Sequence, residues 1–211
     1  MTNVLVIGAS GAIARHVVAD LAGRHDMRTT LYLRNAARIS DLDTTGMKIV
    51  EGDVTDTARL TEAMQGQDIV YANLTGEMDI LAQAVLDAMN AAGVKRLIFV
   101  TSLGIYDEVP GKFGDWNRRE IGAYLPPFRR AADLIEATDL DYTILRPAWL
   151  TDRDEVEYET TTRNEPFKGT EVSRKSVAAY ILTLLEDPAR DIGGNIGLHK
   201  PGTEGDKPAF M

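Results

Sequence analysis

A glycine-rich turn near the amino end limits the fold of this 211-residue chain more than any other feature. The segment Gly8–Ala14 (GASGAIA) lies between the apolar run Val4–Ile7 and the amphipathic run Ala12–Ala22. An uninterrupted β-branched run predicts a strand covered on both faces, and apolar residues at helical spacing predict a helix. A strand, a tight turn and a helix in this order begin a βαβ unit, which is typical of a parallel sheet.

The glycine spacing in this turn favours the binding of an anion. A side chain at Gly8 would clash in the tight turn, Gly11 lets the backbone approach a pyrophosphate, and Ala14 is small enough for the helix to pack on the sheet. The free amides at the start of the helix, Ala12 among them, would face the phosphates together with the helix dipole. The spacing is GxxGxxA rather than GxGxxG, and a purely structural turn is the alternative.

The rest of the chain alternates between strand and helix patterns. Strands are predicted at Thr29–Leu33, Lys48–Val50, Asp68–Ala72, Leu97–Thr101, Tyr142–Leu145 and Asn195–His199, and helices at Leu60–Met64, Met78–Ala92, Phe128–Thr138 and Ser176–Glu186. Gly93 is placed to end the helix Met78–Ala92. The alternation predicts an α/β, Rossmann-type, doubly wound parallel sheet flanked by helices, as one domain over residues 1–211.

Two segments that follow late strands lack this periodicity. Leu103–Pro127 is rich in glycine, proline and aromatic residues, and we expect an irregular region with room for one short helix. Leu150–Thr170 is expected to be irregular, and residues 201–211 to form a tail. Because ligands of open α/β sheets bind beyond the carboxyl ends of the strands, we expect residues 103–127 and 150–175 to form a small substrate side.

Composition excludes several classes of protein. The chain has no cysteine, which rules out disulfides, thiolate metal sites and a cysteine nucleophile. The formal net charge of −9 argues against a general nucleic-acid binder. The three histidines are scattered and no metal motif is present, so no metal is expected. No segment is apolar enough to be a signal peptide or a membrane span, so we expect a soluble, cytoplasmic protein that binds no membrane.

The end of the second predicted strand indicates which dinucleotide is preferred. Proteins that bind NAD usually have an acid there, about 20 residues after the glycine motif, to hold the ribose hydroxyls. This chain has Arg34 instead, followed by Arg38. A guanidinium can hold a 2′-phosphate through two hydrogen bonds, and both arginines would reach one anion if a helical turn begins here. We therefore predict NADP(H), with NAD(H) as a lesser possibility and two solvated arginines as the alternative.

Further candidates follow the later strands. After the third strand, Asp53 would accept from the adenine amino group with Val54 against the ring, although a simple turn cap explains this carboxylate almost as well. After the fourth, the stretch 73–76 (NLTG), with Leu74, Thr75 and Gly76, would line the middle of the cofactor. At the nicotinamide end the candidates are Ser102, Tyr106, Pro147 and Trp149, of which Ser102 and Tyr106 are the candidate catalytic residues. A strand-ending hydroxyl at Ser102 and a core role for Trp149 are the structural alternatives.

Four segments resemble the atypical short-chain dehydrogenase/reductase superfamily, and most closely its NmrA-like and biliverdin/flavin-reductase-like branch. They are VLVIGASGAIARHV at 4–17, GDVTD at 52–56, VKRLIFVTSLGIY at 94–106 and LDYTILRPAWLTD at 140–152. The resemblance implies an NAD(P)-binding protein whose cofactor contacts are Gly8, Ser10, Gly11, Ile13, Arg34, Asp53, Leu74 and Ser102.

One part of the family pattern is missing. Dehydrogenases of the wider superfamily use a YxxxK pair, but the matching stretch runs from Tyr124 to Phe128 and has phenylalanine in place of lysine. A phenol with its ordinary pKa of about 10 is a poor base at neutral pH. This favours a reductase that passes hydride to a flat small-molecule acceptor such as a flavin or quinone, with Ser102 orienting it and Trp149, Tyr106 and Phe113 stacking on it. The alternatives are a non-catalytic NADP(H) sensor and, less favoured, a sugar-nucleotide epimerase.

Overall fold

The computed structural model describes all residues, 1–211, and is built around one eight-stranded sheet with the order β3-β2-β1-β4-β5-β6-β10-β8. Seven of these strands are parallel to their neighbours, and only β8 pairs antiparallel, with β10. The strands are β1 Thr2–Ile7, β2 Met27–Leu33, β3 Lys48–Glu51, β4 Ile69–Ala72, β5 Arg96–Val100, β6 Asp141–Pro147, β8 Glu159–Thr161 and β10 Gly194–His199. The predicted Rossmann-type sheet is confirmed.

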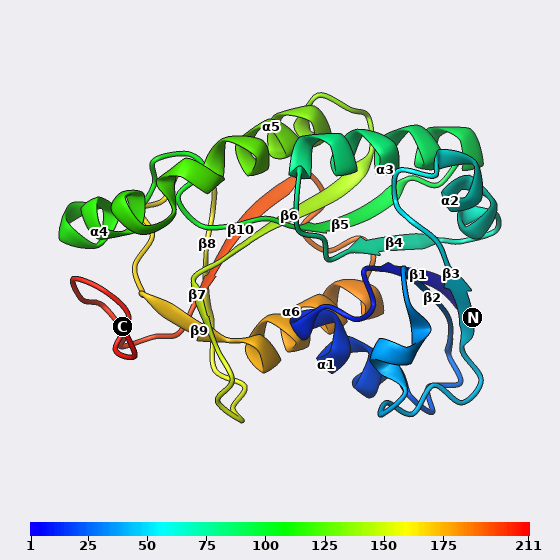
Figure 1. Ribbon diagram of the computed structural model, residues 1–211. Helices are drawn as coiled ribbons and strands as arrows, with labels where there is room; N and C mark the ends of the chain where they lie inside the picture. Colours follow the sequence, from blue (N-terminus) through cyan, green and yellow to red (C-terminus); the bar gives the residue numbers. More distant parts are fainter.

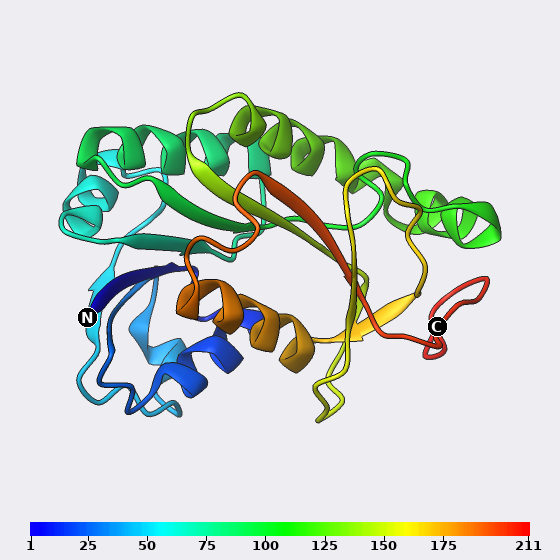
Figure 2. The same cartoon turned by 180° about the vertical axis from the view of Figure 1, so that it is seen from behind.

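Helices cover both faces of the sheet (Figure 1). On one face lie α1 (Ala12–Leu21) and α6 (Arg174–Glu186), which contact each other and are seen from the other side in Figure 2. On the opposite face lie α2 (Thr57–Met64), α3 (Met78–Ala92) and α5 (Leu125–Glu136). The sheet is therefore the middle of three layers, as a doubly wound fold requires.

The first strand shows why its sequence is apolar throughout. Val4 and Val6 belong to the apolar cluster under α1 and α6, whereas Leu5 and Ile7 belong to the cluster under α2, α3 and α5. All four side chains are fully buried. A strand with a helical layer on each side has no face left for polar residues, so alternation disappears.

Local signals set several helix ends, and the end at Gly93 is as predicted. Gly93 ends α3 in the left-handed conformation, with φ of +74°. The Asp56 carboxylate accepts the backbone N–H of Arg59 at the start of α2, and the Ser173 hydroxyl accepts that of Ser176 at the start of α6. Each cap satisfies an amide that has no partner inside its helix.

The two segments expected to be irregular contain more structure than predicted. Residues 103–127 hold the eleven-residue helix α4 (Gly111–Ile121), the 3₁₀ turn η2 (Gly122–Tyr124) and the start of α5. Because glycine and proline are poor helix formers, the sequence pattern did not predict these helices. Prolines are nevertheless tolerated in the first turn of α5, because its amides need no helical partner. In α4 the buried side chains of Phe113 and Trp116 offset its weak propensity.

The second segment is irregular over most of its length, as predicted, but it contains short strands that the sequence did not predict. It contains β7 (Trp149–Thr151), β8 and, just beyond it, β9 (Glu171–Ser173). These strands have three residues each and are defined by pairing of β7 with β9 and of β8 with β10. Such short strands depend on a partner distant in sequence and leave almost no local pattern.

The tail after residue 200 has no helix or strand and is held by side chains. Glu171 is almost fully buried and accepts the backbone N–H of Ala209, and Asp206 pairs with Lys112 of α4. The two termini lie at opposite ends of the molecule (Figure 1). None of the helices has the length and apolar character needed to cross a membrane.

Candidate functional site

A groove of about 180 Å³ lies where the carboxyl ends of β1, β2, β3 and β4 meet. The sheet order reverses between β1 and β4, and such a switch point opens a crevice in doubly wound folds. The groove is lined by Gly8, Ser10, Gly11, Tyr32, Leu33, Arg34, Asn35, Arg38, Gly52, Asp53, Val54, Asn73, Leu74, Thr75 and Leu81. Ten of the predicted cofactor-contact residues are among them.

The glycine turn leaves no room for side chains. Gly8 has φ of +75°, and a Cβ there would overlap the carbonyl oxygen of Asn73. A Cβ on Gly11 would overlap the Asn73 side-chain amide and lie 3.2 Å from the Gly8 carbonyl oxygen. Gly11 in turn donates its N–H to that carbonyl at 2.8 Å. The turn is thus pressed against β4, and its two glycines are required by backbone conformation and by space.

The start of α1 presents unpaired donors to the groove. Gly11 is the capping residue and supplies no side-chain acceptor, and the first turn contains no acid. The first helical hydrogen bond runs from Arg15 N–H to the Gly11 carbonyl, so the amides of Ala12, Ile13 and Ala14 have no acceptor in the protein. Ala12 and Ile13 do not line the groove with their side chains, and any contact they make would be through these amides. Free amides and a positive helix end form a site for a phosphate.

Two arginines face the same groove without protein partners. Arg34 follows β2 and Arg38 lies in the 3₁₀ turn η1 (Ala36–Ile39), so the helical turn needed to bring them together is present. Both are exposed, and neither guanidinium makes a hydrogen bond or an ion pair. No acid stands at the end of β2. A positively charged rim beside the phosphate-binding amides suits a second phosphate group.

The loop after β3 combines a turn cap with a free oxygen. Asp53 Oδ1 accepts the Thr55 backbone N–H at 2.9 Å and its hydroxyl at 2.7 Å, and these bonds hold the pKa of Asp53 below its usual value. Oδ2 has no partner, so the capping role and an adenine contact are compatible. The buried Val54 forms part of the adjacent wall. Tyr32 donates its hydroxyl to the Asp53 carbonyl at 2.8 Å and thereby fixes the loop against β2.

The loop after β4 closes the groove from the other side. Leu74 and Thr75 line it, whereas Gly76, which was predicted with them, does not. Asn73 lines it as well, and its side-chain amide makes no hydrogen bond within the protein, so it is free to meet a ligand. Five lining residues are absent from our predicted contacts: Tyr32, Leu33, Asn35, Gly52 and Leu81. They contact the groove only because tertiary packing brings them there, whereas Asn73 belongs to the stretch 73–76 that was predicted to line the cofactor.

The candidate catalytic residues lie outside this groove. Ser102 is half-buried, and its hydroxyl donates to the Leu103 carbonyl at 3.2 Å. The Tyr106 hydroxyl donates to Glu136 at 3.0 Å and accepts from Asn195 at 2.7 Å, and its ring has the guanidinium carbons of Arg129 and Arg163 within 4.6 and 4.4 Å. Burial and the nearby Glu136 carboxylate raise the pKa of Tyr106 well above its usual value, so this phenol is no base at neutral pH.

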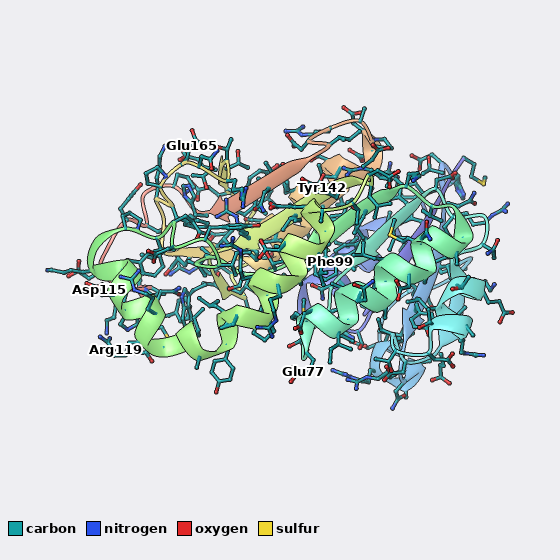
Figure 3. The ribbon with its side chains drawn as sticks, turned by 90° about the horizontal axis from the view of Figure 1, so that it is seen from above. Glu77, Phe99, Asp115, Arg119, Tyr142 and Glu165 are labelled. Carbon is teal, nitrogen blue, oxygen red and sulfur yellow. The ribbon has the colours of Figure 1, made fainter.

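Tyr106 lines a different, polar cavity of about 600 Å³. Glu165 belongs to that cavity and lies toward the end of the molecule that carries α4, marked by Asp115 and Arg119 in Figure 3. Glu77, two residues beyond Thr75, lies nearer the middle of the same view. The structure therefore does not bring Tyr106 and the glycine turn into one pocket.

The remaining predicted residues lie at the end of β6. Pro147 is its last residue, and Trp149 begins β7. The Trp149 ring packs 4.7 Å from that of Trp116, its Nε1 donates to Asn117 at 2.8 Å, and the residue is partly buried. Phe113 is buried against Trp116, so neither of its ring faces is available to an acceptor in this conformation. Tyr124 is 71% exposed and Phe128 is partly buried, and no cation occupies the lysine position beside this phenol.

Comparison with known proteins agrees with this geometry. The model of a family described as NAD(P)H-binding matches residues 8–188. A Rossmann-fold NAD(P)-binding family protein from Shigella flexneri is 56% identical with a TM-score of 0.87, and both chains are fully covered. A short-chain dehydrogenase/reductase from Veillonella parvula, solved in complex with NADP, is 28% identical with a TM-score of 0.93 over 99% of each chain.

A curated relative carries a reductase activity. NAD(P)H azoreductase from Xenophilus azovorans is 28% identical over 123 residues, which cover 56% of this chain and 43% of the azoreductase. The chain covers 36–47% of the length of this and three further reductases or reductase homologues that it matches in sequence.

Proposed function

Because this chain belongs to the NAD(P)H-binding family, an oxidoreductase family with reductase members, we propose that it is an NADPH-dependent reductase of a flat, small-molecule acceptor such as a flavin or quinone. The observation that carries the choice of cofactor is the pair of unpartnered guanidiniums, Arg34 and Arg38, on the rim of the groove. They stand where an NAD-selective protein would place a carboxylate.

The residues of the groove divide the binding of NADPH among them. The amides at the start of α1 would hold the diphosphate, and Arg34 and Arg38 the 2′-phosphate. Val54 and the free oxygen of Asp53 would receive the adenine, and Asn73, Leu74 and Thr75 would line the central part. Gly8 and Gly11 lie so close to Asn73 that a Cβ on either would have no room, and the residues present therefore fit this cofactor.

The chemistry demands little of the protein beyond orientation. Bound NADPH would supply a hydride, that is, two electrons and one proton. A flavin or quinone accepts this hydride and takes one proton from solvent, which balances the reaction with release of NADP⁺. Such acceptors need no buried base, which agrees with the phenylalanine at position 128 and the exposed Tyr124. Ser102, whose hydroxyl has only one weak acceptor, is free to turn toward the acceptor or the nicotinamide amide.

Selective weakening of NADPH binding tests the cofactor assignment. Arg34→Ala should raise the dissociation constant of NADPH about tenfold or more, since a hydrogen bond to a charged group contributes about 1.5–3 kcal/mol. The dissociation constant of NADH should stay within about twofold of the wild-type value. Arg28→Ala is the matched control, because Arg28 is an exposed arginine at the other end of the same strand. Equal wild-type affinity for the two nucleotides in calorimetry would refute the preference.

Turnover separates the reductase from the non-catalytic sensor. Oxidation of NADPH with a panel of flavins and quinones should show activity that Ser102→Ala reduces while nucleotide binding stays nearly intact. The missing lysine and the exposed Tyr124 also suit a sensor, whose partner binding would follow the redox state of the nucleotide. Micromolar NADPH affinity with no turnover on any acceptor would favour that second function.

A further inference from the structure

Arg15 connects helix α1 to the 3₁₀ turn η1, which carries Arg38. Arg15, in the first turn of α1, donates from Nη1 to the carbonyl oxygen of Arg38 at 2.7 Å. Its Nη2 pairs with the carboxylate of Asp41, two residues beyond η1. Arg15 does not line the groove, so these contacts act on the turn and not on a ligand directly.

The turn is held at its other end as well. The Asn35 side chain accepts the Ala37 N–H at 2.9 Å, and Glu51 at the end of β3 accepts the Ala36 N–H at 2.6 Å. Ile39 is buried and anchors the turn to the core. At the carboxyl end the Arg38 carbonyl has no backbone donor, and Arg15 is the group that satisfies it. A turn of four residues has few internal hydrogen bonds, so these external contacts set its position.

We propose that Arg15 is a positioning residue for 2′-phosphate selectivity, acting through the backbone of η1. Its two hydrogen bonds fix the distance between the helix that would take the diphosphate and the turn that carries Arg38 and follows Arg34. Arginine suits this role because its planar fork reaches a carbonyl and a carboxylate at the same time, which one ammonium group does less well. Holding the turn before the ligand arrives lowers the ordering cost of binding. This inference rests on the proposed preference for NADP(H).

Binding of nucleotide fragments tests the role directly. The probes are 2′,5′-ADP, which carries the 2′-phosphate, and 5′-AMP, which does not, each titrated by calorimetry. Arg15→Met should raise the dissociation constant of 2′,5′-ADP about fivefold and that of 5′-AMP less than about twofold, because only the first ligand uses the turn. Arg15→Lys keeps the charge but not the forked geometry, and should lose about threefold of the affinity for 2′,5′-ADP.

The matched control lies just beyond the same helix. Arg24 follows α1, pairs with Asp26 and Glu186, and has a side chain 30% exposed, compared with 29% for Arg15. Arg24→Met should leave both dissociation constants unchanged. Thermal unfolding of each variant shows whether a loss of binding reflects a loss of folded protein.

Each other outcome has a definite meaning. If Arg15→Lys binds 2′,5′-ADP as the wild type does while Arg15→Met does not, Arg15 contributes only charge and the proposal is overturned. Equal losses of affinity for 2′,5′-ADP and 5′-AMP would mean that Arg15 acts through helix α1 rather than through η1, and this would also overturn the proposal. If the wild-type protein binds 2′,5′-ADP no better than 5′-AMP, the proposed preference for NADP(H) itself fails. If the wild type is selective for 2′,5′-ADP and the Arg15→Met variant is equally selective, that preference stands and only the role of Arg15 is overturned.

Discussion

Arg146→Met should destabilise the protein strongly. Arg146 is fully buried and donates to Asn195 Oδ1 at 2.6 Å, to the Thr162 carbonyl at 3.1 Å and to the Glu108 carboxylate. The Glu108 side chain is 4% exposed, and its carboxylate also accepts the backbone N–H groups of Gly104 and Tyr106, each at 3.0 Å. One guanidinium thus ties the loop after β5 to the segment after β8 and to β10.

The size of the effect follows from what the substitution leaves behind. Methionine roughly fills the volume, so the main cost is a buried carboxylate without its cation and a carbonyl without its donor. Breaking a buried ion pair by removing one partner costs about 3–5 kcal/mol. For a chain of this size each kcal/mol corresponds to about 2–4 °C, so the melting temperature should fall by roughly 6–20 °C.

Urea unfolding followed by circular dichroism measures the change in the free energy of unfolding. The exposed pair of Lys112 and Asp206 gives the control, and Lys112→Met should cost less than about 1 kcal/mol. The double variant Arg146→Met/Glu108→Gln should recover at least about 1 kcal/mol, because it removes the uncompensated charge. A loss below about 1 kcal/mol for Arg146→Met alone, with an unchanged m-value, would refute the reasoning.

Three further predictions concern smaller changes. Gly11→Ala should weaken NADPH binding at least about tenfold with little loss of secondary structure, as titration and circular dichroism would show, since its Cβ would overlap the Asn73 amide; wild-type affinity would contradict the tight turn. Gly93→Ala should lower stability by about 1 kcal/mol in urea unfolding, because φ is +74° although no atom lies within 4 Å of the added Cβ, and an unchanged midpoint would be inconsistent with this cap. The hydrogen bond from Arg24 lowers the pKa of Asp26 from 3.8 to about 2, so this pair stabilises the fold above pH 3.8 and its contribution is lost as the pH falls from there toward 2. Asp26→Asn should therefore flatten the pH dependence of stability in that window. An unaltered profile would show that the pair contributes nothing.

Part of the candidate site could be found from sequence because its signals are local. Gly8, Gly11, Arg34 and Asp53 each follow a strand that is recognisable by itself, and parallel strands bring their carboxyl ends to one edge. Contacts between residues far apart in the sequence could not be predicted. Tyr106 follows Ser102 by only four residues, yet its hydroxyl lies between Glu136 and Asn195, which no local pattern relates to it.

The sequence by itself determined the parallel sheet, the glycine turn and the position of the arginines after β2. These depend on backbone geometry and on apolar burial within a few residues, which the order of amino acids specifies directly. Only the tertiary structure decided that Arg15 would cap the Arg38 carbonyl, that Arg146 would join three distant segments, and that the short strands β7, β8 and β9 would form. Such features depend on groups separated by many residues, whose contacts exist only after the chain has closed its loops and excluded water from the interior.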